Sequence, residues 1–160
     1  GTLTYTWADK GSRPPAPRDC RYSWAYIFGA VCPARDTGAG LVLPYADKEA
    51  MTLHLAKIGE AVTPAANPVV ILDGAGWHKP GGRLTLPDNV STLLLPPYSP
   101  ELNPQENIWQ YLRQNYLSNR VFGTYEAIVD ACCAAWMALM NQPDKIRSIA
   151  TREWAKGVMA

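Results

Sequence analysis

Two acidic residues lie at predicted boundaries between elements, one at the end of a strand and one at the start of a helix. Asp73 follows directly after the apolar run VVIL, Glu106 lies in NPQENIW, and 32 residues, 74–105, separate them. Two carboxylates that meet without a basic partner suit a hard divalent cation, usually Mg²⁺ or Mn²⁺ with several waters retained. The pair therefore indicates a metal site, provided that the fold brings the two side chains together.

Each acid also has a simpler explanation. Asp73, taken alone, fits a helix cap or a loop acid. In NPQE, Asn103 fits an N-cap, Pro104 suits the first helical position and Glu106 falls at the third, which is close to a capping box. Read alone, this second motif favours capping. The elements that carry the acids decide between these roles.

The chain begins with strand patterns and ends with helix patterns. Alternation of apolar and polar residues predicts strands in the first part of the chain. A change to helical spacing of the apolar residues then predicts a helix with Asp47 as its N-cap. Two continuous apolar runs predict strands that are buried on both faces. The fold class is therefore α/β, with a mixed sheet that is antiparallel first and parallel later, and with helices on its faces. The expected strands are 2–7, 22–32, 40–45, 69–72 and 90–95, and the expected helices lie within 46–62 and at about 104–118, 124–141 and 143–154.

The two continuous strands connect the acids. If 69–72 and 90–95 are parallel neighbours, both end at the sheet edge where ligands collect in α/β folds. Asp73 then lies at that edge, and the loop PPYSPEL carries the chain back over it to Glu106. A helix N-terminus keeps a carboxylate such as Glu106 ionised. Taken together, the pattern favours a shared site over two separate caps.

Length, charge and cysteines narrow the class of protein. A chain of 160 residues suits one domain, and its net charge of +1 says little as a total. The stretch 10–21 is locally basic, which fits either a solvated loop or a phosphate-contacting patch. The cysteines form no CxxC pair and are expected to be reduced thiols of a cytosolic protein, with Cys132 in the core. No signal peptide or membrane span is expected.

Several side chains near these motifs are expected to be structural. His54 lies on the same side of its helix as Met51 and Ile58, so we interpret it as a packing residue. Trp109 and Leu112 are likewise expected to pack.

One long motif resembles a known family. LDGAGWHK followed by LPPYSPELNPQENIWQYL resembles the mariner-type superfamily of DDE transposases, particularly its bacterial insertion-sequence branch, and the resemblance extends through RYSWAYIFGAVCP over nearly the whole chain. It implies a ribonuclease H-like fold. It also implies an Asp-Asp-Glu triad that holds two Mg²⁺ or Mn²⁺ ions, cuts the ends of a mobile element and joins them to target DNA.

The resemblance assigns roles residue by residue. Asp73 matches the second acid of the triad and Glu106 the third, whereas Glu101 matches a loop acid. His78 matches a histidine common after the second acid, although packing against Trp77 is an equal alternative. The expected DNA-contacting side chains are basic: Arg13, Arg18, Arg21, His78, Lys79 and, more weakly, Arg113. The implied partners are the element's terminal repeats, target DNA and a second subunit of the full-length protein. The implied location is the bacterial cytoplasm, at the nucleoid.

The chain departs from the family pattern at the first acid. That Asp normally ends a strand upstream of the stretch resembling GTLTYTW, and Asp9, in the turn Asp9–Gly11, is a poor substitute. Residues 1–160 are therefore expected to be a partial catalytic domain without its first strand or the usual helix-turn-helix region, and to have weak or no activity alone. The alternatives are a non-catalytic DNA-binding or subunit-interaction remnant and a simple two-metal nuclease. A glycosidase would need a sugar cleft with acids about 5–9.5 Å apart, and nothing in the sequence favours one.

Overall fold

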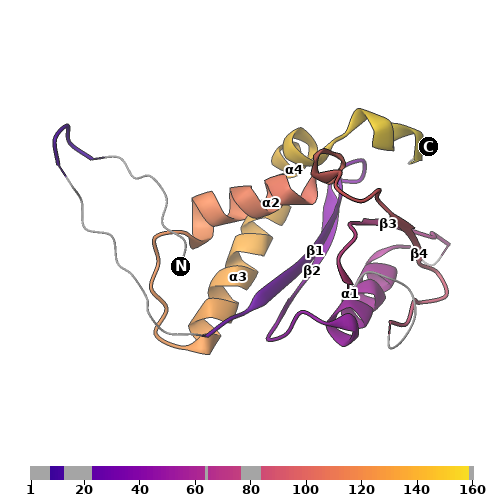
Figure 1. Cartoon of the computed structure of the whole chain (residues 1–160), viewed down its shortest axis with the longest axis horizontal. Helices are drawn as coiled ribbons and strands as arrows, with labels where there is room; N and C mark the ends of the chain where they lie inside the picture. Colours follow the sequence, from indigo (N-terminus) through magenta and orange to yellow (C-terminus); the bar gives the residue numbers. More distant parts are fainter. Residues whose placement is uncertain (1–7, 13–22, 64, 77–83, 159–160) are drawn as a thin grey trace.

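A computed structural model of the chain describes residues 8–12, 23–63, 65–76 and 84–158 (Figure 1). The strand expected at 2–7 lies outside these residues. The elements are β1 (Tyr26–Cys32), β2 (Thr37–Leu43), α1 (Lys48–Ala61), β3 (Val69–Leu72), β4 (Ser91–Leu94), the 3₁₀ turn η2 (Pro100–Leu102), α2 (Gln105–Leu112), the π-helical turn η3 (Arg113–Leu117), α3 (Tyr125–Met140), α4 (Pro143–Ala150) and the 3₁₀ turn η4 (Glu153–Val158). The α/β class is confirmed.

β1 and β2 form an antiparallel hairpin whose two faces bury different residues. Gly29 pairs with Gly40, and Phe28 pairs with Leu41. Phe28 faces the core under α1, whereas the glycine pair faces α3. The tight turn between the strands contains Asp36 at φ +53°, a left-handed conformation that Asp tolerates better than most residues.

α1 begins as the sequence predicts. The Asp47 carboxylate accepts a hydrogen bond of 2.8 Å from the amide of Ala50, so Asp47 is the N-cap. Met51 and Leu55 are 2% and 0% exposed on its inner face. His54 is also buried and lies beside Phe28, with ring centroids 5.9 Å apart, which confirms its structural role.

β3 and β4 pair in parallel, as expected, but they are less buried than their apolar sequences indicate. Val70 and Leu72 are 9% and 6% exposed, whereas Val69 is 47% and Leu93 is 42% exposed. The expectation that both faces are buried is therefore wrong for the described structure. The reason is that the residues of α1 cover one face of this small sheet, and the other face is only partly covered.

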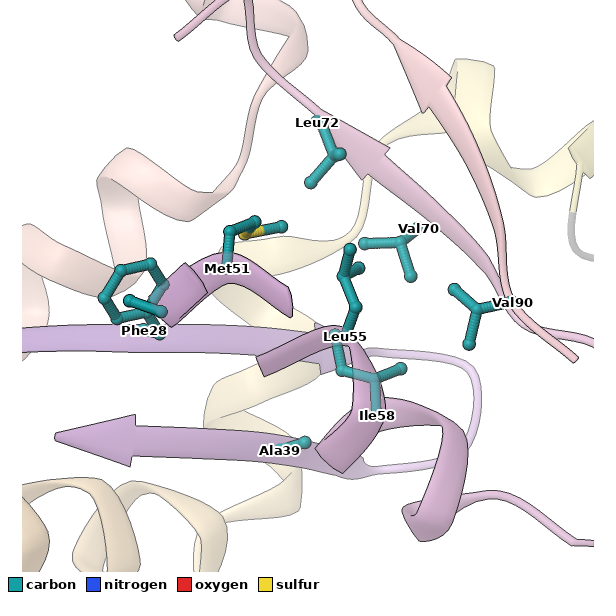
Figure 2. Packing of buried hydrophobic residues seen from close by; sticks show 9 residues of the cluster. Phe28, Ala39, Met51, Leu55, Ile58, Val70, Leu72 and Val90 are labelled. Carbon is teal, nitrogen blue, oxygen red and sulfur yellow. The ribbon is translucent and has the colours of Figure 1, made fainter. Parts of the chain in front are cut away.

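One helix supplies a core shared by two small sheets. The described strands form a β1–β2 sheet and a β3–β4 sheet rather than one continuous mixed sheet. Leu55 of α1 lies among side chains from both sheets, including Val70 of β3 and Ala39 of β2, and Figure 2 shows these residues converging. α1 therefore holds the two sheets together on one side.

A second core lies on the opposite face of the hairpin. α2, α3 and α4 meet there around Ile108, Leu139 and Ile146, each 0% exposed. Trp136 of α3 lies against the glycine pair: a Cβ built on Gly29 or Gly40 would fall 2.5 Å or 2.7 Å from its ring atoms. The glycines are thus required by the close approach of the indole.

Polar side chains join the helices of this second core. The Tyr111 hydroxyl donates to Gln142 over 3.1 Å, and Gln142 donates to the hydroxyl of Tyr116 over 2.9 Å. Burial first, and then the neighbouring Tyr116, raise the pKa of Tyr111 above its ordinary value. Arg147 of α4 forms ion pairs with Asp36 and Asp144, which ties the hairpin turn to α4. A hydrogen bond to Asp144 and the charge of Asp36 raise the pKa of Arg147.

The adjacent thiols of α3 differ in accessibility. Cys132 is 6% exposed, which confirms its place in the core, whereas Cys133 is exposed. Burial, and secondarily the neighbouring Cys133, raise the pKa of the Cys132 thiol. A higher pKa lowers the thiolate fraction at a given pH, and the thiolate is the nucleophile.

We therefore expect iodoacetamide to alkylate Cys133 at least about tenfold faster than Cys132 in the folded protein at mildly alkaline pH. Peptide mass spectrometry of timed samples measures both rates, and unfolding in urea should make them similar. Equal rates in the native protein would contradict this arrangement of α3.

Candidate metal site

Asp73 lies at the carboxyl end of β3. The strand ends at Leu72, and the exposed Asp73 side chain accepts a hydrogen bond of 3.0 Å from the amide of Ala75. This contact two residues ahead makes an Asx turn, which orients the carboxylate at the strand end. The position at a strand end that the sequence predicts for this acid is confirmed.

The chain leaves β4 at the same edge of the sheet. The amide of Leu95 donates to the carbonyl of Leu72 over 2.8 Å, so the parallel ladder continues to the last residue before Asp73. The loop 96–104 therefore starts beside Asp73 and then runs to the start of α2 (Figure 1). This edge carries both the second strand end and the approach to Glu106.

The loop itself is short and held by local bonds. The amide of Leu102 donates to the carbonyl of Ser99 over 3.1 Å, within the turn η2. The side chain of Asn103 accepts from the amide of Gln105 over 3.0 Å. α2 begins at Gln105, with Pro104 as the residue before it, so the helix starts one residue later than expected. The side chain of Asn103 still closes the turn that leads into the helix.

Glu106 is exposed in the first turn of α2. Within the described part of the chain its carboxylate accepts no hydrogen bond from Asn103, so the capping box is not formed. Glu106 is therefore an oxygen donor that the local structure does not use.

The donor set at this edge suits a hard cation but is small. Asp73 and Glu106 are the predicted ligands, and both are exposed carboxylates. Among residues 8–12, 23–63, 65–76 and 84–158, no group of three or more His, Cys, Asp or Glu side chains converges as a metal-binding cluster. The role of Asp73 and Glu106 as metal ligands therefore stays a prediction.

The remaining predicted residues lie elsewhere. Asp9 is exposed in the expected turn, where the amide of Ser12 donates to its carbonyl over 2.9 Å. Arg113 follows the last residue of α2, about 10 Å along the helix axis from Glu106. The structure therefore does not bring Arg113 to the acidic edge. The other predicted DNA contacts lie outside the described residues: Arg13, Arg18, Arg21, His78 and Lys79.

A groove that the sequence did not predict lies at the Arg113 end of α2. Its volume is about 250 Å³, and it is lined by Ala25, Tyr26, Ile27, Trp109, Leu112, Arg113 and Leu117. Trp109 and Leu112 also contribute to the second core, which confirms their packing role. Since apolar residues at helical spacing predict a core as readily as a groove, no sequence signal would have identified it.

No described helix is long and apolar enough to cross a membrane.

Comparison with known proteins adds a family match. The family described as DDE superfamily endonuclease matches residues 1–129. A protein of Sinorhizobium fredii named "Uncharacterized protein y4pE/y4sA" is 61% identical over 132 residues, which cover 82% of this chain and 97% of that protein. No solved structure matches the chain significantly.

Proposed function

Because this chain belongs to the DDE superfamily of endonucleases, we propose that it is a transposase catalytic domain of the mariner type, from the bacterial insertion-sequence branch. Its reaction is the cleavage of mobile-element ends and their transfer to target DNA. The observation that carries the proposal is the shared sheet edge: Asp73 ends β3, and the loop from the parallel neighbour β4 leads directly to Glu106.

Asp73 and Glu106 are the residues that would hold Mg²⁺ or Mn²⁺. Both present carboxylate oxygens, the donors that these ions prefer. The Ala75 amide orients Asp73, and the local structure leaves Glu106 without a capping bond. Once bound, two such cations supply Lewis-acid stabilisation of the phosphodiester and activation of the attacking oxygen. The carboxylates would act as metal ligands and not as proton shuttles.

The order of elements supports a ribonuclease H-like fold. An antiparallel hairpin, a helix and a parallel pair follow one another, and α1 packs on both sheets. We propose that the first acid of the triad comes from outside the described residues. The described residues would then be weak or inactive as a catalyst without that acid, and the protein would work as a homodimer at the bacterial nucleoid.

DNA is the proposed substrate, in the form of terminal repeats and target. Phosphate contacts from the basic residues Arg13, Arg18, Arg21, His78 and Lys79 position a duplex without reading its sequence. Arg113 is the weakest of these proposed contacts, since it lies at the end of α2 that is remote from Glu106.

A second candidate is a non-catalytic remnant that binds DNA or a sister subunit. It is favoured by the lack of a three-acid cluster within the described ranges. It predicts DNA binding that persists in a chelator and survives Asp73→Asn, with no metal-dependent cleavage by any longer form of the chain.

The test of the metal site is Mn²⁺ binding by the protein. We expect Asp73→Asn and Glu106→Gln each to weaken Mn²⁺ binding at least about tenfold, because even the loss of outer-shell partners of a metal typically costs 10–100-fold. Isothermal titration calorimetry, or electron paramagnetic resonance of free Mn²⁺, measures the affinity.

Glu101→Gln is the matched control, since it removes the same charge from the exposed loop acid five residues before Glu106. It should leave Mn²⁺ affinity within about twofold, the range of a screened long-range charge effect. Equal affinities for wild type, Asp73→Asn and Glu106→Gln would refute the assignment of both ligands.

A further inference from the structure

The loop beside the acidic edge holds one aromatic ring entirely in solvent. Tyr98 is 101% exposed, more than any other large apolar or aromatic side chain of the described structure. It lies three residues after Leu95, whose amide bonds to the last residue before Asp73. The ring therefore projects into solvent from the loop that starts beside Asp73, without packing against the protein.

The backbone at Tyr98 is in an unfavourable conformation. Its φ is +60°, and the other non-glycine residues with positive φ in the described chain are Asp36 and Asn119. Asp and Asn are the residue types that tolerate this left-handed region, whereas a bulky aromatic residue there is an outlier. Such outliers persist where the surrounding structure fixes them, and they cluster at functional sites. The neighbouring prolines and the turn η2 fix the loop here.

The charge of this edge narrows what the ring can bind. Asp73, Glu101 and Glu106 are all exposed acids around the loop, so they disfavour close contact with a bare phosphate. The flat face of a nucleobase carries no net charge and stacks well on an aromatic ring. A base is available for stacking only when it is unpaired or displaced from the duplex.

We infer that Tyr98 is a stacking residue for an unpaired base of DNA at the edge that carries Asp73 and Glu106. The inference deepens the proposed function and rests on its assignment of DNA as the substrate. The ring would hold a base that has left the duplex at this edge.

The experiment compares two labelled duplexes in a chelator, so that it does not depend on metal binding or cleavage. One duplex is fully paired, and the other carries a single unpaired 2-aminopurine. We expect the wild-type protein to prefer the second duplex and to quench its 2-aminopurine fluorescence. Tyr98→Asn should reduce affinity for that duplex roughly tenfold and abolish the quenching, while leaving affinity for the paired duplex within about twofold, since phosphate contacts are unchanged.

A second variant and a stability measurement separate the effect of the ring from an effect on the fold. Tyr98→Phe keeps the ring and should bind like wild type. Tyr98→Asn suits the left-handed backbone, so its thermal midpoint should equal or exceed that of wild type, which excludes misfolding as the cause of lost binding.

The outcomes distinguish this inference from the proposed function. If both duplexes bind equally and Tyr98→Asn changes neither, the stacking role is overturned and DNA as the substrate stands. If no DNA binds at all, both are overturned. If Tyr98→Asn instead changes the sedimentation of the protein from one oligomeric state to another, the ring belongs to a subunit contact and the inference is wrong.

Discussion

Replacing Trp136 by Ala is expected to lower the free energy of unfolding by about 3–5 kcal/mol, the range for removing a large aromatic side chain from a core. Trp136 is 7% exposed on α3 and lies against the glycine pair of the hairpin. Its ring also lies 6.3 Å from that of Trp109, centroid to centroid. The remaining structure cannot close the cavity easily, because the facing strands carry no side chain at Gly29 and Gly40. Urea unfolding followed by far-ultraviolet circular dichroism measures the change.

Met137→Ala is the matched control for this prediction. Met137 is the next residue of the same helix and is 58% exposed, so its replacement should change stability by no more than about 0.5 kcal/mol. A similar loss for both variants would show that helix propensity, and not the contact with the hairpin, determines the effect.

A double-mutant cycle sharpens the same prediction. Gly40→Ala alone should cost about 1–3 kcal/mol, because its new Cβ would overlap the indole. In the Trp136→Ala background the same methyl group has room, so the double variant should be clearly more stable than the sum of the two losses. Strict additivity would contradict the close contact.

The second large effect is expected from Leu55→Ala, with a loss of about 2–5 kcal/mol. Leu55 is 0% exposed and lies where α1 packs on residues of both sheets, as Figure 2 shows. Its truncation removes contacts to the hairpin and to β3 together. Urea unfolding should therefore show one transition that moves to lower denaturant for the whole protein.

Leu53→Ala is the control that tests whether the loss of stability depends on which face of α1 the leucine occupies. Leu53 belongs to α1 but is 52% exposed, so its loss should be within about 0.5 kcal/mol. If Leu55→Ala costs less than about 1 kcal/mol, a value typical of surface changes, the shared core does not hold the sheets as described.

The sequence predicted the elements whose signals are local. The cap at Asp47, the helix that follows and the strands within 69–72 and 90–95 depend on residue types within a few positions, and all are confirmed. The parallel pairing of the two strands was inferred from the strand–helix–strand order and is also confirmed. The start of α2 was one residue off, since the Asn103 side chain bonds to Gln105 rather than deeper into the helix.

The sequence did not predict features that depend on distant partners. A run such as VVIL fits a strand covered on both faces, yet Val69 remains exposed because no described element covers it fully. In the sequence, Gly29 and Gly40 appear only to weaken two strands. The structure shows that they make room for the ring of Trp136, which lies about a hundred residues further along the chain. The division into two sheets is likewise a long-range property that no local pattern encodes.

The candidate site was predicted in part. Asp73 directly follows β3 and Glu106 lies in the first turn of α2, as the sequence predicts for the two elements, whereas the role of the two acids as metal ligands stays a prediction. Tyr98 was missed because a Tyr between prolines carries no sign of a left-handed backbone, which sequence patterns associate with Gly, Asn and Asp.

The glycine pair under the indole also constrains how this chain can diverge. Any single replacement of Gly29 or Gly40 adds a Cβ that meets the ring at once, whereas shrinking Trp136 first leaves a cavity. Both routes pass through a less stable intermediate protein, so the three positions are expected to change together or not at all. Selection is therefore expected to keep or change the three residues together, although only Trp136 resembles a core residue in the sequence.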